Sequence, residues 1–364
     1  MDKTIELSLA KDYVSDWGVW EGVRELIQNT LDAGSKDIAF GNDSITFKTN
    51  KGGLSVDKLL LGSGTKKDDS SSIGGHGEGL KVALLALVRE GCDVALYNKV
   101  DSLVWKPTFK LSEVFGIETL HIEEHAIGNC DYLDDDLTIV VTGLSEEEIN
   151  TIKEKYLYSE LNNADMYETS YGDILFDPLL KGKVFVKGLY VSTINSLDYG
   201  YNFKPQYIKL DRDRRQVSTF DVKWQAKEMW REYSSASSEG VALLAAHVHA
   251  GTSDTEYMNH TTPTKEVVGA CTDIYTEKYK GNMLADSYED CEKLKKQGYT
   301  NVVFLGNEAF TSIVKSSRSY KDLDFNKEVV KSFTEYLEEF KDKWYDEFST
   351  ECLDDLDALI SKIS

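Results

Sequence analysis

Residues 24–33, RELIQNTLDA, decide the fold of this chain. They lie within residues 16–33, whose hydrophobic side chains recur at helical spacing, so we expect an amphipathic helix here. Glu25, Asn29 and Asp32 follow one another at intervals of about one helical turn, which places their side chains along one stripe. A carboxylate one turn from a carboxamide suits a water-activating base beside a Mg²⁺ ligand, because Mg²⁺ takes oxygen ligands. A solvated polar face is the alternative interpretation of this stripe.

A glycine-rich segment, IGGHGEGLK at residues 73–81, leads into a second hydrophobic helix expected over residues 80–89. Glycines at the start of a helix let backbone N–H groups approach a phosphate chain at the positive end of the helix dipole. The segment is a candidate phosphate site, and a flexible loop without a ligand is the alternative. Its candidate residues are Gly74, Gly75, His76, Gly77, Glu78, Gly79, Leu80 and Lys81. Lys81 either reaches the phosphate or remains an exposed helix residue.

Two other phosphate-binding motifs do not fit this segment. A Walker A loop requires G-x-x-x-x-G-K-[ST], and neither residues 62–66 nor residues 74–81 supply it. A dinucleotide-binding fold requires its glycine motif directly after a buried strand, whereas the polar run DDSSS at residues 68–72 comes first here. The sequence context therefore excludes both.

Six β-strands are expected around these motifs, because hydrophobic runs alternate with turn-forming residues. They cover residues 37–40, 44–48, 93–97, 103–109, 118–122 and 137–142, and a helix is expected over 145–158. Gly53 follows the second strand, where a glycine lets a nucleobase lie against the main chain. Thr138 lies in the last strand, and its hydroxyl can donate or accept a hydrogen bond.

In this order the motifs resemble those of the GHKL superfamily of DNA gyrase, heat-shock chaperone, histidine kinase and MutL ATPases, over roughly residues 10–145. The resemblance implies an α/β fold of the α+β two-layer sandwich type, a Bergerat-type ATP-binding domain, with ATP and Mg²⁺ as its ligands. It implies that Glu25 is the general base, that Asn29 binds Mg²⁺ and that Asp32 supports the same site.

The same resemblance assigns roles to the glycine-rich segment and its surroundings. Gly75, Gly77 and Gly79 look like the phosphate-binding glycines, and residues 61–72 look like the ATP lid. Thr138 looks like the late-strand threonine of the nucleotide site.

The adenine-reading motif departs from the family pattern. An aspartate followed by Asn-Gly-x-Gly is expected, whereas residues 47–53 read FKTNKGG. Asn50 is then the candidate that accepts a hydrogen bond from an adenine amino group, because its side-chain oxygen is an acceptor. In several GHKL families a basic residue of the following domain reaches the γ-phosphate. The candidates here are Lys187, Arg212 and Arg214, with surface Asp–Arg pairing as the alternative for the arginines.

Changes of pattern divide the chain into three parts. These are the ATP-binding domain at residues 1–155, a second α/β region resembling a transducer at 156–325, and a C-terminal acidic amphipathic helix at 326–364. In the second region we expect strands over 182–191 and 207–210, a helix over 221–233, and alternating strands and helices over 282–318.

Two histidine patterns are not expected to bind metal. His247 and His249 alternate as they would on one face of a strand or loop, without a carboxylate or cysteine at metal-ligand spacing. The pair His121 and His125 encloses two glutamates in the reverse of the zincin order, at the expected end of a strand. Both patterns are interpreted as structural.

Composition limits the classes of partner. The chain carries 63 acidic and 41 basic residues, a net charge of -22, which makes binding to nucleic acid or anionic lipid unfavourable. No hydrophobic run approaches the roughly 18–20 residues that span a bilayer, and residues 1–17 show no secretory signal. Five cysteines without a CxxC pair argue against a zinc site or a disulfide framework. We expect a cytoplasmic protein.

The sequence therefore predicts an ATPase that binds Mg²⁺ and ATP, hydrolyses ATP slowly to ADP and couples this to lid closure and conformational change. A protein partner is also predicted, and the resemblance implies a homodimer formed on ATP binding. The alternative is a catalytically weak or inactive nucleotide-binding protein whose acidic surface binds and inhibits or sequesters a partner protein. A protein histidine kinase is disfavoured, because no helix with a histidine in an H-E/D context precedes the ATP-binding domain.

Overall fold

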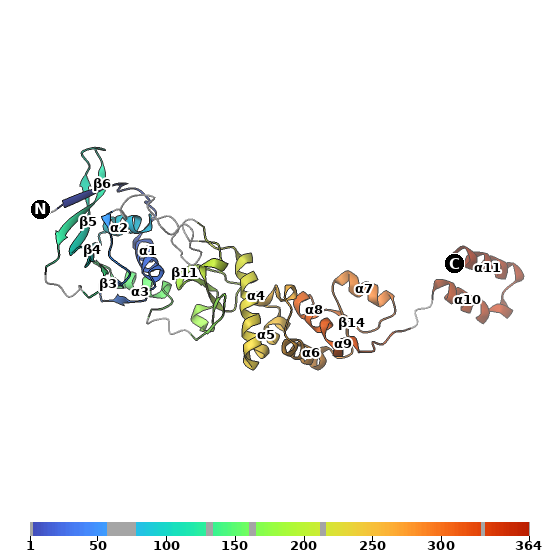
Figure 1. The fold of residues 1–364 in the computed structure, drawn as a ribbon. Helices are drawn as coiled ribbons and strands as arrows, with labels where there is room; N and C mark the ends of the chain where they lie inside the picture. The colour runs from blue at the N-terminus through green and yellow to red at the C-terminus, as the bar shows by residue number, and fades with distance from the viewer. Residues whose placement is uncertain are drawn as a thin grey trace. The chain divides into compact units, whose positions relative to one another are not determined.

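The computed structural model describes residues 3–56, 78–128, 134–159, 165–211, 216–328 and 332–363. The chain forms two compact units, Met1–Met229 and Trp230–Ser364. Both units combine helices with β-strands, so the predicted α/β class is confirmed at that level (Figure 1). The predicted division into residues 1–155, 156–325 and 326–364 stays a prediction.

The first unit begins with a seven-stranded sheet in the order β1-β6-β5-β4-β7-β3-β2, in which all neighbours are antiparallel. Its strands are β1 (Lys3–Ala10), β2 (Ile38–Phe40), β3 (Ser44–Thr49), β4 (Asp93–Asn98), β5 (Leu103–Leu111), β6 (Glu118–Ala126) and β7 (Leu137–Thr142). The six strands expected from the sequence are all present, and β1 was not expected. β1 pairs with β6 at one edge of the sheet.

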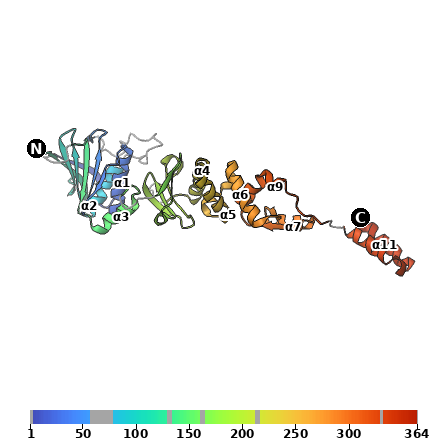
Figure 2. The same cartoon turned by 90° about the horizontal axis from the view of Figure 1, so that it is seen from below.

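Three helices, α1 (Val19–Asp32), α2 (Gly79–Arg89) and α3 (Glu146–Lys155), lie on one side of this sheet (Figures 1 and 2). Alternate residues of each strand point toward them, as in Val94 and Leu96 of β4 and Ile139 and Val141 of β7. These side chains form one buried cluster with the hydrophobic faces of α1 and α2. Each fully buried Leu, Ile or Val stabilises the fold by about 1.5–3 kcal/mol relative to exposure.

α1 and α2 pack closely because a glycine lies between them. A Cβ added at Gly22 would lie 2.7 Å from Leu87 Cγ and 3.3 Å from the Ala83 carbonyl oxygen. Leu87 is fully buried at this contact. Only glycine lets the two helix backbones approach this closely.

The chain enters α1 through a loop that is held by the far end of α2. The guanidinium of Arg89 donates to the carbonyl oxygens of Lys11, Tyr13, Val14 and Trp17, at 3.2, 3.0, 3.0 and 2.7 Å. The five N–H donors of an arginine fork suit such a set of acceptors. Arg89 therefore fixes the start of α1 relative to the end of α2.

The rest of the first unit contains a five-stranded sheet in the order β11-β10-β12-β9-β8 and the start of α4 (Thr219–Ala236). The strands are β8 (Met166–Glu168), β9 (Gly172–Leu175), β10 (Lys183–Val186), β11 (Leu189–Thr193) and β12 (Gly200–Phe203). The stretch predicted as strand over 182–191 contains β10 and most of β11, separated by a turn at Lys187 and Gly188, which both have positive φ. The strand predicted over 207–210 is wrong, because Pro205 starts a 3-10 turn that includes Tyr207.

The second unit contains helices α5 (Ser238–Ala250), α6 (Lys265–Tyr279), α7 (Tyr288–Lys296), α8 (Glu308–Ser316) and α9 (Arg318–Lys321). The parallel strands β13 (Met283–Ala285) and β14 (Val302–Phe304) are joined through α7, so the alternation predicted over 282–318 is confirmed. His247 and His249 lie in α5, which corrects the strand or loop expected there. Within the described residues, none of the helices combines the length and the hydrophobicity that spanning a bilayer requires.

The single long helix expected after residue 326 is wrong. Two shorter helices, α10 (Phe333–Lys343) and α11 (Thr350–Ile363), are separated by a 3-10 turn. Ser332 Oγ accepts from the Glu335 N–H, and Ser349 Oγ accepts from the Cys352 N–H, so each helix has its own N-terminal serine cap. The helical run that the hydrophobic spacing predicted as continuous thus ends at Lys343 and starts again after Ser349.

Candidate functional site

Glu25 is buried at the contact between α1 and the start of α2. Its side chain is only 3% exposed, and its Oε1 lies 3.3 Å from Arg24 Nη2. A Cβ added at Gly79 would lie 2.5 Å from Glu25 Oε2, so the carboxylate rests against the main chain at the first residue of α2. This burial excludes a solvated polar face as the explanation for Glu25.

The guanidinium of Arg24 is fixed by an aromatic ring as well as by Glu25. It lies 5.5 Å from the centre of the Trp17 ring and is itself buried. Arginine stacks well on aromatic faces because its charge is delocalised and weakly hydrated. The Arg24 guanidinium is therefore held in a fixed position beside the Glu25 carboxylate.

The other two members of the stripe differ from each other. Asn29 is partly exposed on α1. The Asp32 side chain is fully buried, and its Oδ1 lies 2.6 Å from Lys187 Nζ. Lys187 occupies the turn between β10 and β11, with φ of 52°. The structure thus brings Lys187 to α1, where it pairs with Asp32.

The start of α2 offers backbone donors and a buried lysine. Glu78 occupies the N-cap position but its side chain makes no capping hydrogen bond. The first N–H groups of a helix have no acceptor within the helix and carry the positive end of the dipole. Lys81 is buried, and this burial lowers the pKa of its ammonium while the charge of Glu78 opposes the shift. Lys81 is therefore not the exposed helix residue that the sequence left open.

Part of the predicted site lies outside the described residues. This applies to Gly74, Gly75, His76, Gly77, Arg212 and Arg214, and to the lid predicted over residues 61–72. Their predicted roles stay predictions. Leu80 packs against the hydrophobic core of the first unit, next to Gly79.

Asn50 is engaged by the loop before β7. Its Nδ2 donates to Asp135 Oδ1 at 2.8 Å, and its Oδ1 accepts from the Asp136 N–H at 3.1 Å. The Gly52 N–H donates to Asp136 Oδ2 at 2.8 Å in the same contact. Asn50 therefore positions residues 50–52 against this loop.

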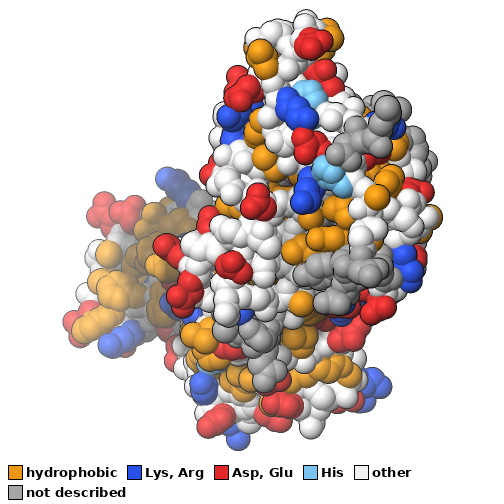
Figure 3. All heavy atoms as spheres, turned by 90° about the vertical axis from the view of Figure 1, so that its left-hand side faces the viewer, with side chains coloured by type: hydrophobic (Ala, Val, Ile, Leu, Met, Phe, Trp, Pro, Cys, Tyr) orange, Lys and Arg blue, Asp and Glu red, His pale blue; other side chains and the backbone are white. Residues whose placement is uncertain are grey.

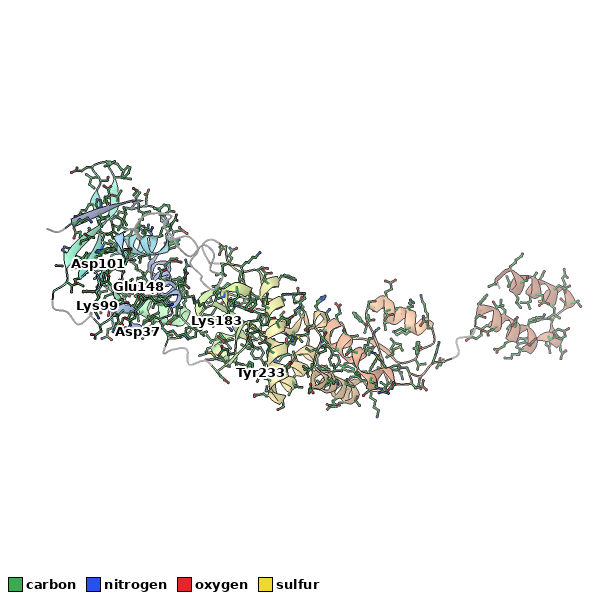
Figure 4. The ribbon with its side chains drawn as sticks, viewed as in Figure 1. Asp37, Lys99, Asp101, Glu148, Lys183 and Tyr233 are labelled. Atoms are coloured by element: carbon green, nitrogen blue, oxygen red, sulfur yellow. The ribbon has the colours of Figure 1, made fainter. Side chains whose placement is uncertain are left out.

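Asn98 was not predicted, and it lies beside Gly53. Its Nδ2 donates to the Leu54 carbonyl at 2.7 Å and to Asp101 Oδ2 at 2.9 Å. Asp101, which is labelled in Figure 4, lies in the turn after β4. Its Oδ1 is buried and has no hydrogen-bond partner among the described residues. A Cβ added at Gly53 would clash with this oxygen. The only sequence signal was an asparagine at the end of a strand.

Thr138 is not brought together with Glu25. It alternates along β7 with Ile139, whose side chain belongs to the cluster beneath α1 and α2, so Thr138 faces the other side of the sheet. Figure 3 views that side, where hydrophobic side chains gather among charged ones. Thr138 Oγ1 is buried without a hydrogen-bond partner in the described part of the chain.

The histidines make contacts within the fold. His249 Nε2 lies 3.1 Å from the Tyr279 hydroxyl, and His247 packs on the Trp230 ring at 5.6 Å. His121 Nδ1 lies 3.0 Å from the Thr119 carbonyl and His125 faces Glu123, both within β6 rather than at the strand end that was expected. Over the ranges that the structure describes, no three His, Cys, Asp or Glu side chains form a group that could hold a metal ion.

Three juxtapositions result in the first unit: Glu25 with Gly79, Asp32 with Lys187, and Gly53 with Asn98. No known protein family matches the chain, and no curated protein matches it. The chemistry of these three contacts therefore carries the functional argument.

Proposed function

We propose that the first unit is a GHKL-type ATPase with a Bergerat-type nucleotide site, which binds Mg²⁺ and ATP and hydrolyses ATP slowly. The observation that carries the proposal is the buried Glu25 carboxylate lying against Gly79 at the start of α2. A buried acid beside a helix N-terminus places a proton acceptor next to a group of donors suited to phosphate. This combination fits hydrolysis of a phosphoanhydride by water.

Glu25 serves as the base that orients the attacking water and accepts its proton. Its burial keeps competing solvent away, and the fixed Arg24 guanidinium beside it limits how its carboxylate can turn. The N–H groups at the start of α2 and the Lys81 ammonium hold the phosphate chain, because both carry positive charge at that end of the helix.

Asn29 is one turn from Glu25 and partly exposed, so its side-chain oxygen is available to a hydrated Mg²⁺. Mg²⁺, when bound, neutralises the charge that develops on the phosphate oxygens. Glu25 and Asn29 thus divide the work, one handling the proton and the other the metal.

The test measures Mg²⁺-dependent phosphate release and, separately, the binding of a non-hydrolysable ATP analogue. Glu25→Gln keeps the shape of the side chain but removes its basicity, so release should fall by about 10²–10³-fold while binding changes little. Glu90→Gln, an acid-to-amide change at the far end of α2, is the matched control and should keep both. Wild-type protein that binds no nucleotide would refute the proposal.

One observation favours the second candidate, a nucleotide-binding protein without turnover that sequesters a partner. Arg24 Nη2 lies 3.3 Å from Glu25 Oε1, so one carboxylate oxygen of Glu25 is already engaged by the guanidinium instead of facing a water. This candidate would be supported if the wild type and the Arg24→Met variant both bind the analogue and neither releases phosphate. Phosphate release by the wild type that depends on Glu25 would exclude it.

A further inference from the structure

The two polar atoms of the Asn98 side chain differ: Nδ2 is hydrogen-bonded, whereas Oδ1 has no hydrogen-bond partner among the described residues. Nδ2 donates to the Leu54 carbonyl and to Asp101 Oδ2, and both of these atoms are acceptors. A flipped amide would place Oδ1 against the same two acceptors, so the observed orientation is the one that the surroundings require. Oδ1 is thereby held in place as an acceptor, buried, with no donor among the described residues.

A buried acceptor without a partner destabilises the fold, because it has lost its hydrogen bonds to water, so native proteins rarely leave one unless it has a use. The neighbour of Oδ1 is a glycine, and any side chain at Gly53 would occupy its position. Residues 51–55 carry no regular secondary structure, and Gly53 lies between two anchored residues: the Gly52 N–H donates to Asp136 Oδ2, and the Leu54 carbonyl accepts from Asn98 Nδ2. A flat ligand entering beside Gly53 would reach Oδ1 once the main chain there moves outward.

The topology places Oδ1 at the same end of the fold as Glu25. Asn98 and Leu96 alternate with Tyr97 along β4, and Leu96 belongs to the cluster beneath α1 and α2, so Asn98 is on the helix side of the sheet. A short connection, Glu90–Cys92, joins α2 to β4. β4 therefore runs back along α2, and its last residue, Asn98, lies toward the end at which Gly79 begins α2.

We propose that Asn98 Oδ1 recognises the base of the bound nucleotide by accepting a hydrogen bond from its exocyclic amino group, an inference that rests on the proposed ATP site. This assigns to Asn98 the role that the sequence gave to Asn50, whose Oδ1 already accepts from the Asp136 N–H. Asp101 is a positioning residue, because it holds Nδ2 and so directs Oδ1 toward the base.

The experiment compares the dissociation constants of ATP and purine riboside 5′-triphosphate, which lacks only the 6-amino group. Wild-type protein should bind ATP about tenfold or more tightly than this analogue, because the analogue leaves a buried acceptor without its donor. Asn98→Ala should bind the two nucleotides equally. Asp101→Ala removes one of the two acceptors that hold Nδ2, so it should reduce the preference for ATP without abolishing it, because the Leu54 carbonyl still accepts from Nδ2.

Each outcome decides one proposal or the other. An Asn50→Ala variant that loses the preference while Asn98→Ala keeps it overturns the role of Asn98 and leaves the ATP site standing. Equal binding of both nucleotides by the wild type has the same meaning. Wild-type protein that binds neither nucleotide overturns the ATP site and the role of Asn98 together. Thermal melting of each variant shows whether a loss of binding reflects a loss of folding.

Discussion

Replacement of Lys187 by methionine should destabilise the contact between α1 and the β10–β11 turn more than replacement of its partner Asp32 by asparagine. The Asp32 side chain is 0% exposed and the Lys187 side chain is 27% exposed, with 2.6 Å between the charged atoms. Lys187→Met removes the cation beside a buried carboxylate, which costs roughly 3 kcal/mol at the lower end of the range for buried pairs. Asp32→Asn costs only about 1 kcal/mol, because the lysine can turn toward water.

The assay is hydrogen exchange of peptides from α1, which reports local opening without requiring the two units to unfold together. About 3 kcal/mol corresponds to an increase in exchange of the order of 10²-fold for Lys187→Met. Methionine and lysine are equally strained at φ of 52°, so backbone strain does not contribute to the difference between Lys187→Met and the wild type. Equal effects of the two single variants, with additive effects in the double variant, would show that the pair does not form in solution.

Three further predictions concern other parts of the chain. Gly79→Ala should lower phosphate release at least tenfold, because the added Cβ displaces the Glu25 carboxylate. It should cost little stability, because alanine suits a helix. Gly269→Ala, whose Cβ meets nothing within 4 Å, is the control in the phosphate-release and thermal-melting assays. Burial raises the pKa of the Cys271 thiol to about 12, so the folded state keeps this proton after the unfolded thiol loses it near its ordinary pKa of 9.0. The urea midpoint of the second unit should therefore fall as the pH rises above 9, and a midpoint that does not change up to pH 10.5 would contradict this. Arg89→Met should lower the free energy of unfolding by about 2 kcal/mol. Arg89→Lys should recover only part of that loss, because one ammonium cannot donate to all four carbonyls. Complete recovery by Arg89→Lys in urea titrations would rule out the role of the guanidinium.

The local elements of the first unit could be predicted because their periodicity agrees with their tertiary surroundings. Residues 93–98 alternate, and Val94 and Leu96 do point into the core. β1 was not predicted, although polar and hydrophobic residues alternate from Thr4 to Leu9 as they do in a half-buried strand. α5 was missed because two histidines at a spacing of two residues suggested a strand, whereas the helix is set by Ser237 at its start and Gly251 at its end.

The contacts of the candidate site could be predicted only in part. The stripe on α1 follows from spacing, so Glu25 and Asp32 were identified from the sequence. The pairing of Asp32 with Lys187 joins residues 155 positions apart, and no local pattern encodes it. Asn98 was not predicted for the same reason. Its candidate role depends on its contacts with Gly53 and Leu54, which are distant in the sequence and lie beside it only in the folded chain.

The Arg89 fork and the Gly22 contact together remove the freedom of α1 and α2 to move separately. Arg89 joins the end of α2 to the loop before α1, and the close contact of Gly22 with Leu87 fixes the position where the two helices cross. Sliding of either helix would break several carbonyl contacts at once and force Gly22 against Leu87. Two probes placed on these helices would thus keep a constant separation, and any change of shape must be carried by the segments that leave the pair.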